Sequence, residues 1–246
     1  MPLYKEQGVV LRSMKLGEAD RIVTLMTQGE GKVRAVAKGI RKTTSRFGAR
    51  LEPLTHVSLM CYRGRGDLDT VSQAEIVAPF RAVRDDLALI AEAETMVEAV
   101  DRVAQDHERN VRLFLLLLGG LRALDARPAD PELVAQSFLL KLLSLSGFHA
   151  TLTACAACGR PEPTRFSSPQ GGAVCANCAE GDAEPVDPNA LAFLAALGDA
   201  DLADAGAFTV DLPLRRTARS LLFAFAEYHV DRRLKSLPML SRSVAR

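Results

Sequence analysis

The sequence predicts an α+β protein of several domains: a small N-terminal β-barrel, then an α-helical domain that carries a four-cysteine insert. Three observations support this fold class. Five short runs rich in β-branched residues precede Pro79, apolar residues recur at helical spacing after it, and four cysteines interrupt the helical part. The expected boundaries are 1–79 for the barrel, 80–150 and 186–246 for the helical domain, and 151–185 for the insert. The 246 residues, 48% of them hydrophobic, are enough for one or two domains with a buried core.

The five expected strands are separated by turn residues. They read KEQGVVLR, DRIVTLMT, GKVRAVAKG, LTHVSLMCY and DTVSQAEIV. TQGEGK fits a hairpin and RGRGD fits another turn, because glycine reaches the backbone angles that tight turns require. Five strands in so short a span predict a barrel of the OB type. Cys61, alone in the fourth run, is expected in the core.

Helices are expected after Pro79. Their predicted positions are residues 80–100, 108–125, 131–146, a short segment from 188 and a last segment over 214–228. The first and last are amphipathic, with apolar residues on one face. Asp130-Pro131 and Asp187-Pro188 are typical helix starts, because aspartate caps the first turn and proline fits its first position.

Positive charge gathers in the stretch GKVRAVAKGIRKTTSRFGARLEP, although the whole chain has a formal net charge of only +1. The stretch holds seven basic residues and no acid before Glu52. These candidate DNA-binding residues are Lys32, Arg34, Lys38, Arg41, Lys42, Arg46 and Arg50. Cations this close together repel one another unless an anion lies nearby. The phosphate backbone of a nucleic acid is such an anion, and it releases condensed counterions when lysine and arginine bind it. The stretch therefore predicts nucleic-acid binding on the barrel.

Side chains alternate along a strand, so Lys32, Arg34 and Lys38 are expected on one face of the third strand. The residues that follow read as a flexible loop. Phe47 could stack on a base, but core packing is the favoured interpretation. The alternative for the whole stretch is a solvated basic face.

A second basic group lies near the C-terminus, after a segment from Phe166 to Leu214 that contains no lysine or arginine and eight acids. Its residues, secondary DNA-binding candidates, are Arg215, Arg216, Arg219, Arg232 and Arg233. Residues four apart on a helix share a face and could extend a phosphate-binding surface. Pairing with the acids of the preceding segment is the alternative.

The insert contains two C-x2-C pairs separated by sixteen residues. The cysteines are Cys155, Cys158, Cys175 and Cys178. This spacing is typical of a structural Zn²⁺ site, one ion per chain, in which four thiolates fill the tetrahedral positions and leave none for substrate. The alternative is a redox pair.

Several functions are not expected. The sequence has no H-x-E deaminase triplet, no H-E-x-x-H, no G-x-S-x-G and no phosphate-loop motif, so we predict no catalytic residue and no small-molecule substrate. No apolar run is long enough to cross a membrane, and the opening residues do not resemble a signal peptide. We therefore expect a cytoplasmic protein that does not associate with membranes.

The stretch GVVLRSMKLGEADRIVTLMTQGEGKVRAVAKGIRKTTSRFGARLEP resembles the opening of the bacterial recombination mediator family RecO. LKLLSLSGF, the four cysteines and RRLKSLPML resemble later landmarks of that family, in the same order. Ile40 departs from the small residue that often follows this glycine. The resemblance implies an OB barrel, a helical domain and a zinc-containing insert, without use of ATP. It also implies binding of single- and double-stranded DNA, annealing of complementary strands, and loading of RecA together with RecR on DNA covered by single-strand-binding protein.

These inferences lead to one functional expectation: a non-enzymatic, nucleoid-associated mediator of recombinational DNA repair, with DNA, RecR and single-strand-binding protein as partners. Two alternatives stay open. The cysteines could form a zinc-thiolate redox sensor or protein-interaction module. The basic stretch could equally bind RNA, since RNA presents the same phosphates.

Overall fold

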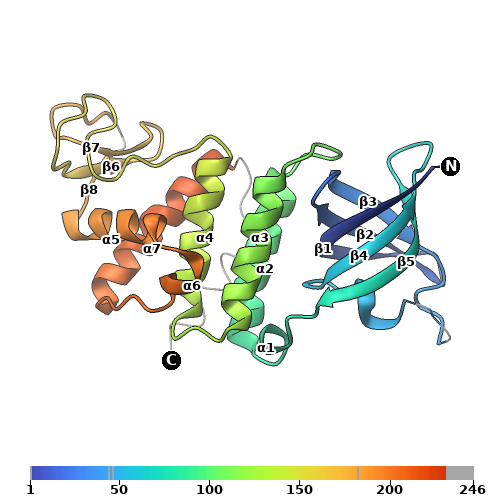
Figure 1. Cartoon of the computed structure of the whole chain (residues 1–246). Helices are drawn as coiled ribbons and strands as arrows, with labels where there is room; N and C mark the ends of the chain where they lie inside the picture. Colours follow the sequence, from blue (N-terminus) through green and yellow to red (C-terminus); the bar gives the residue numbers. More distant parts are fainter. Residues whose placement is uncertain (1, 44, 46, 182, 231–246) are drawn as a thin grey trace. The chain divides into compact units, whose positions relative to one another are not determined.

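The computed structural model describes residues 2–43, 45, 47–181 and 183–230 (Figure 1). The chain divides into two compact units, Met1–Asp125 and Ala126–Arg246. The boundary expected at residue 79 marks the change from strands to helices, whereas the compact units divide after the first three helices, which pack with the barrel. The functional domains expected at 1–79, 80–150 with 186–246, and 151–185 stay a prediction.

The N-terminal unit contains a closed five-stranded barrel. Its strands are β1 (Leu3–Leu16), β2 (Asp20–Thr27), β3 (Gly31–Ala37), β4 (His56–Tyr62) and β5 (Asp69–Ala78). They pair in the order β1-β2-β3-β5-β4, all antiparallel except β3 with β5. A 3₁₀ turn, η1 (Gly48–Leu51), lies between β3 and β4. The predicted OB-type barrel is confirmed, because each of the five runs forms one strand, although β1 extends beyond its run at both ends, from Leu3 to Leu16.

Alternate residues of each strand fill the barrel. In β3, Val33, Ala35 and Ala37 are buried, whereas the residues between them are only half-buried. Phe47 is 1% exposed and belongs to the barrel core, so the prediction of core packing is confirmed. Cys61 is also in the core, at 2% exposure.

Three helices follow the barrel: α1 (Arg81–Arg84), α2 (Leu87–Val103) and α3 (Val111–Asp125). The single helix predicted from residue 80 is wrong, because Asp86 interrupts it. The Asp86 carboxylate accepts hydrogen bonds from the backbone N–H groups of Ala88 and Leu89 and so begins a new helix. Leu87, expected on the apolar face, is 85% exposed.

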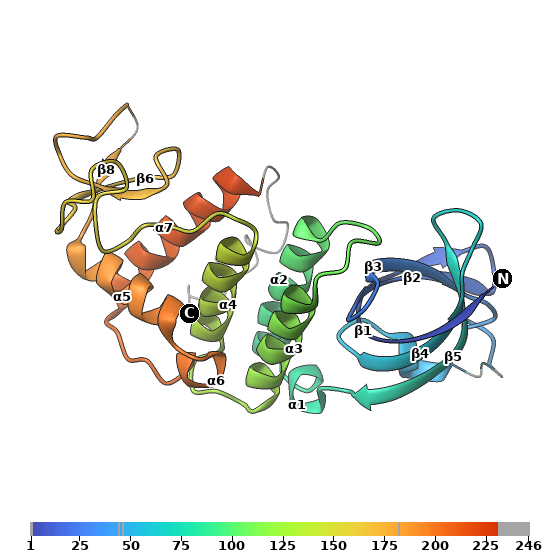
Figure 2. The same ribbon diagram turned by 45° about the horizontal axis from the view of Figure 1, so that its top comes forward.

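Helices α2 and α3 cover the outer face of β1 and β2. Val9, Thr24 and Met26 point away from the barrel interior, yet none is more than 2% exposed. Helix α2 contacts β1, and α3 contacts both β1 and β2 (Figure 2). Two layers of apolar residues therefore lie on these strands, one inside the barrel and one beneath the helices.

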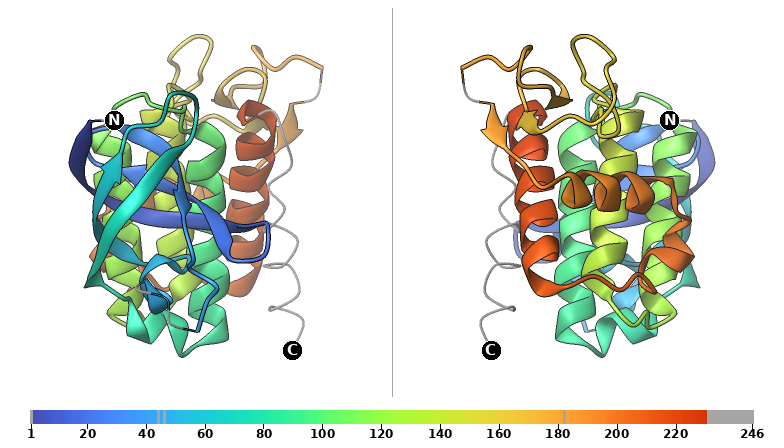
Figure 3. Two further views of the ribbon diagram at one scale, coloured as in Figure 1. Left: turned by 90° about the vertical axis from the view of Figure 1, so that its right-hand side faces the viewer. Right: turned by 90° about the vertical axis from the view of Figure 1, so that its left-hand side faces the viewer.

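The C-terminal unit is helical, with a small sheet in its insert. Its elements are α4 (Pro131–Leu145), β6 (Arg165–Ser167), β7 (Gly172–Val174), β8 (Glu184–Pro185), α5 (Pro188–Asp199), α6 (Leu202–Ala205) and α7 (Leu212–His229). Asp130 and Asp187 cap α4 and α5 as predicted, whereas α6 was not expected. The insert lies at the C-terminal end of α7, where Phe225 contacts Phe166 and the His229 ring is 3.2 Å from the carbonyl oxygen of Ser168 (Figure 3). Within the described residues, no helix is both long and apolar enough to cross a membrane.

His56 lies buried where β4 meets α3. It is 2% exposed, and its ring packs edge-on against Phe114, with 5.9 Å between ring centroids. Neither ring nitrogen has a hydrogen-bond partner among the described residues. Burial, and to a smaller extent the charge of Arg122, lowers the pKa of His56 below its ordinary value.

We expect this histidine to make folding pH-dependent. Because its pKa is lower in the folded chain, the unfolded chain binds more protons below about pH 6.5, and the His56 contribution is lost as the pH falls through that value. One such group changes the free energy of unfolding by at most about 1.4 kcal/mol per pH unit. In urea unfolding, the free energy of unfolding should fall less between pH 8 and pH 5 for His56→Phe than for the unchanged chain. Equal losses would contradict this role.

Candidate nucleic-acid interface and metal centre

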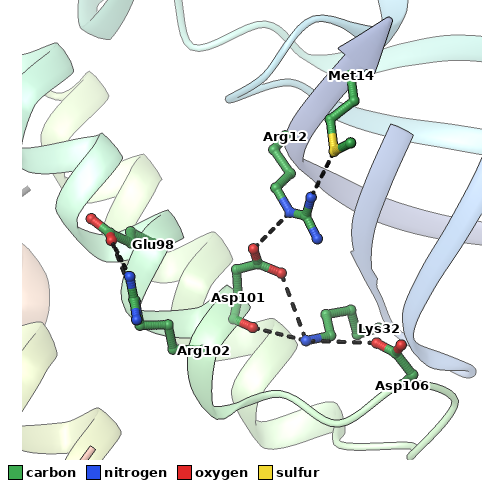
Figure 4. Close-up of polar contacts among 7 residues, drawn as sticks. All are labelled: Arg12, Met14, Lys32, Glu98, Asp101, Arg102 and Asp106. Atoms are coloured by element: carbon green, nitrogen blue, oxygen red, sulfur yellow. Dashed lines mark hydrogen bonds and ion pairs between the residues drawn. The ribbon is translucent and has the colours of Figure 1, made fainter. Parts of the chain in front are cut away.

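Lys32 is held by acids from the helical side of the N-terminal unit. Its Nζ donates a 2.8 Å hydrogen bond to the carbonyl oxygen of Asp101 and lies 3.7 Å and 3.6 Å from the carboxylates of Asp101 and Asp106 (Figure 4). The side chain is 15% exposed. The expectation that Lys32 belongs to an open basic face is therefore not supported, because its charge is balanced within the molecule.

The same aspartate also binds β1. The Arg12 Nε donates to Asp101 Oδ2 at 2.8 Å, so one carboxylate near the end of α2 joins cations from two strands (Figure 4). The backbone N–H of His107 donates to the carbonyl oxygen of Lys32. A Cβ added at Gly31 would lie 2.0 Å from the carbonyl oxygen of Glu108, which shows how closely the loop after α2 approaches β3. We call these residues, Arg12, Lys32, Asp101 and Asp106, the acidic clamp.

Arg34 and Lys38 do not share one environment. Arg34 is half-buried opposite Thr24, and its Nε is buried without a hydrogen-bond partner among the described residues. Lys38 lies in the turn just beyond β3 and is exposed. The predicted row of three strand cations is thus divided between a covered face and an open end.

The loop after β3 keeps its cations exposed. The four described by the structure are Lys38, Arg41, Lys42 and Arg50. Phe47 anchors the loop in the barrel core, and Arg50 Nη1 donates to the Phe47 carbonyl oxygen at 3.2 Å. Arg46 lies outside the described residues.

Hydrogen bonds join this loop to the turn between β1 and β2. Arg41 donates through its backbone N–H to Ala19 and through Nη1 to the carbonyl oxygen of Gly17, at 2.9 and 3.2 Å. The Gly39 N–H donates to Asp20 Oδ1 at 2.7 Å. The two segments therefore form one surface at this end of the barrel.

Two basic residues at this surface were not predicted from the sequence. Lys15 of β1 lies opposite Arg21 of β2, which in turn lies opposite Ala37, the residue before Lys38. Lys15 is exposed, whereas Arg21 is half-buried and lies 3.3 Å from Glu52. The pairing register of the first hairpin was the signal that could have found them. We call Lys15, Arg21, Lys38, Arg41, Lys42 and Arg50 the basic end.

The C-terminal arginines mostly serve the fold. Arg215 binds both Asp130 and Glu132 at the start of α4, and Arg219 Nη1 lies 3.2 Å from Glu132. Their expected role in DNA binding stays a prediction, and the structure shows both guanidinium groups engaged by these acids. The partners also differ from the alternative, which named the acids just before α7. Arg216 is exposed, and Arg232 and Arg233 lie outside the described residues.

The four cysteines of the insert come together as the spacing predicts. The Sγ atoms of Cys155, Cys158, Cys175 and Cys178 all lie within 4.8 Å of one another, and that of Cys158 is 3.9 Å from that of Cys175. A tetrahedron with metal–sulfur bonds of about 2.3 Å has edges of roughly 3.8 Å, so the cluster can hold a metal ion.

Local hydrogen bonds shape this cluster. The Cys155 N–H donates to the Arg160 carbonyl oxygen at 2.8 Å, and the Cys178 N–H donates to that of Cys175 at 3.0 Å, which tightens both knuckles. Backbone N–H groups, that of Cys175 first and that of Cys158 next, lower the pKa of Cys155 to about 6. This favours the thiolate, the form that binds metal.

Comparison with known proteins identifies the family of this chain. A family model described as "Recombination protein O N terminal" matches residues 1–80, and one described as "Recombination protein O C terminal" matches residues 84–238. Proteins named "DNA repair protein RecO" from Frankia casuarinae and Cutibacterium acnes are 44% and 43% identical to the chain. The alignments cover 99% and 98% of this chain and all of each relative. A protein of the same name from Streptomyces avermitilis is 41% identical over 96% of this chain and 98% of its own length. With the OB-type barrel and the four-cysteine cluster in place, these matches show that the chain belongs to the recombination protein O (RecO) family.

Proposed function

We propose that this protein is a non-enzymatic DNA-binding mediator of recombinational repair. In this proposal it binds single- and double-stranded DNA, anneals complementary strands, and assists RecR in loading RecA onto DNA covered by single-strand-binding protein. The observation that carries it is the basic end, where exposed cations from the first hairpin and the loop after β3 lie together. The names of the relatives, which describe DNA repair, support the same role.

Phosphate recognition explains why this surface keeps its charge exposed. Neither Lys38 nor Lys42 has a side-chain partner within the described ranges, and both are exposed. A cation in water contributes little to folding, but it gains on meeting DNA because condensed counterions are released from the phosphates. Lys32 is excluded from the proposed interface, since its ammonium group is paired with the carboxylates of Asp101 and Asp106. Arg216 and the residues Arg232 and Arg233 stay secondary candidates.

The metal proposed for the insert is one structural Zn²⁺ per chain. Four thiolates complete its tetrahedral coordination, so its contribution is to hold the two knuckles together rather than to activate water or substrate. Cys155, Cys158, Cys175 and Cys178 would supply the four sulfur ligands. We propose a cytoplasmic, nucleoid-associated protein that needs neither ATP nor a small-molecule substrate.

Charge reversal at the loop tests the DNA interface. Replacing Lys38, Arg41 and Lys42 by Glu should abolish most binding of a fluorescent single-stranded oligonucleotide. Milder Gln replacements should lower the steepness of the log Kd–log salt plot by about 2, since each phosphate contact on a single strand contributes roughly 0.7. Fluorescence anisotropy at several salt concentrations measures both quantities.

The matched control places the same change of charge elsewhere on the N-terminal unit. Lys5, Arg81 and Arg112 are exposed cations of β1, α1 and α3. Glu at these three positions should leave most of the affinity intact. Equal losses in both triple variants would mean that net charge, rather than this surface, determines binding. Competition with an RNA of the same sequence separates DNA binding from the RNA alternative.

Removal of the metal should affect the C-terminal unit. Replacing Cys155 or Cys175 by Ser should lower the free energy of unfolding of that unit by several kcal/mol, because metal binding is coupled to folding. Elemental analysis should find one zinc per unchanged chain, and oligonucleotide binding should persist in a variant that stays folded. A folded serine variant that no longer binds DNA, or reduced protein without metal, would contradict the proposal.

A further inference from the structure

Part of the barrel face that OB-type domains usually present to a nucleic acid is covered in this chain. Such domains bind oligonucleotides on the face of their second and third strands and on adjoining loops. Here Thr24 and Met26 of β2 are 2% and 0% exposed on that face, and Lys32 of β3 is 15% exposed. Helix α3 contacts β2, and the loop after α2 approaches β3. The helices and the loop after α2 therefore cover the part of this face around Thr24, Met26 and Lys32, whereas Ile22, Arg34 and Val36 are half-buried.

Carboxylates as well as apolar packing lie against the covered part of this face. The acidic clamp places two carboxylates against β3, and both Asp101 and Asp106 are more exposed than Lys32, whose charge they balance. Displacing the helices would separate these ion pairs and expose Val9, Met26 and Phe114, each of which is at most 2% exposed. Uncovering this part of the face would therefore break the contacts of the acidic clamp (Figure 4).

The basic end offers an open alternative. The turn between β1 and β2 is joined to the loop after β3 by the hydrogen bonds of Arg41 and Gly39. Lys15 enters this surface from β1, two positions before Gly17, and is exposed. Glu18, Asp20 and Glu52 lie in the same segments, but Glu52 is engaged by Arg21 and the Asp20 carboxylate accepts from the Gly39 N–H. The exposed cations thus come from three parts of the chain: β1, the turn after β3, and η1.

We propose that single-stranded DNA crosses the barrel over the basic end, that Lys15 is a further phosphate contact there, and that the covered part of the β2–β3 face around Lys32 takes no part. This inference rests on the proposed function, since it specifies the path of the DNA whose binding is proposed above. It assigns Lys15 a role that the acid-free stretch does not suggest.

Neutral variants at two lysines and at the acidic clamp test this path. Lys15→Gln should weaken binding of a single-stranded oligonucleotide several-fold at low salt and lower the salt slope by about 0.7. Lys5→Gln is the matched control, because Lys5 is an exposed lysine of the same strand. The double variant Lys32→Gln with Asp101→Asn removes charge from both sides of the clamp and should leave affinity and slope within twofold of the unchanged chain.

The outcomes separate this inference from the proposed function. If the unchanged chain binds no single-stranded DNA, the proposed function fails. If it binds but Lys15→Gln behaves like Lys5→Gln, or the clamp variant loses as much affinity as Lys15→Gln, the path is wrong. Circular dichroism and urea unfolding establish whether the clamp variant is folded.

Lysine acetylation gives a readout that needs no variant. With the oligonucleotide bound, mass spectrometry should show protection of Lys15, Lys38 and Lys42 but not of Lys5. Lys32 should react slowly with or without DNA, because its amine is paired and its side chain is 15% exposed. Fast modification of Lys32 that DNA suppresses would overturn the proposal.

Discussion

The ion pairs of the Asp101 carboxylate determine which cations of the N-terminal unit are neutralised within the molecule. It binds Arg12 of β1 and Lys32 of β3, while the backbone after α2 bonds to β3. Partly buried ion pairs add little net stability, because the loss of hydration offsets their attraction. Breaking them by removing one partner is costly, however, so they fix where the helices sit on the barrel.

Apolar burial supplies the stability that this arrangement needs. Val9 and Met26 are fully buried on the outer side of their strands, and Phe114 of α3 is 2% exposed. Each such side chain contributes about 1.5–3 kcal/mol when removed from water. The helices are therefore part of the barrel's fold rather than a mobile cover. Part of one side of the barrel is covered, and a group of exposed cations lies at one end.

The sequence predicted features that depend on local chemistry. Strand alternation placed Val33, Ala35 and Ala37 inside the barrel, aspartate–proline pairs located the starts of α4 and α5, and the cysteine spacing anticipated a cluster able to hold a metal. Each follows from neighbours within a few residues or from a regular repeat. The break at Asp86 was missed because the apolar spacing continues through Leu87, whose side chain is nevertheless exposed.

Features that depend on distant partners could not be predicted in this way. Nothing near Lys32 in the sequence shows that Asp101 and Asp106 neutralise it, and Arg215 binds acids more than eighty positions earlier. Lys15 was missed for the related reason that only strand register brings it toward Lys38. Composition can show that a segment is basic, whereas folding decides which of its charges stay exposed.

Hydrogen–deuterium exchange with and without a single-stranded oligonucleotide tests most directly whether DNA binds the basic end and not the surface that the helices cover. We predict that DNA slows exchange in residues 16–20 and in the described part of the loop from 38 to 50, and leaves exchange in residues 104–110 unchanged. Faster exchange in residues 104–110 on DNA binding, together with slower exchange along β2 and β3, would show that the helices move aside and would contradict this prediction.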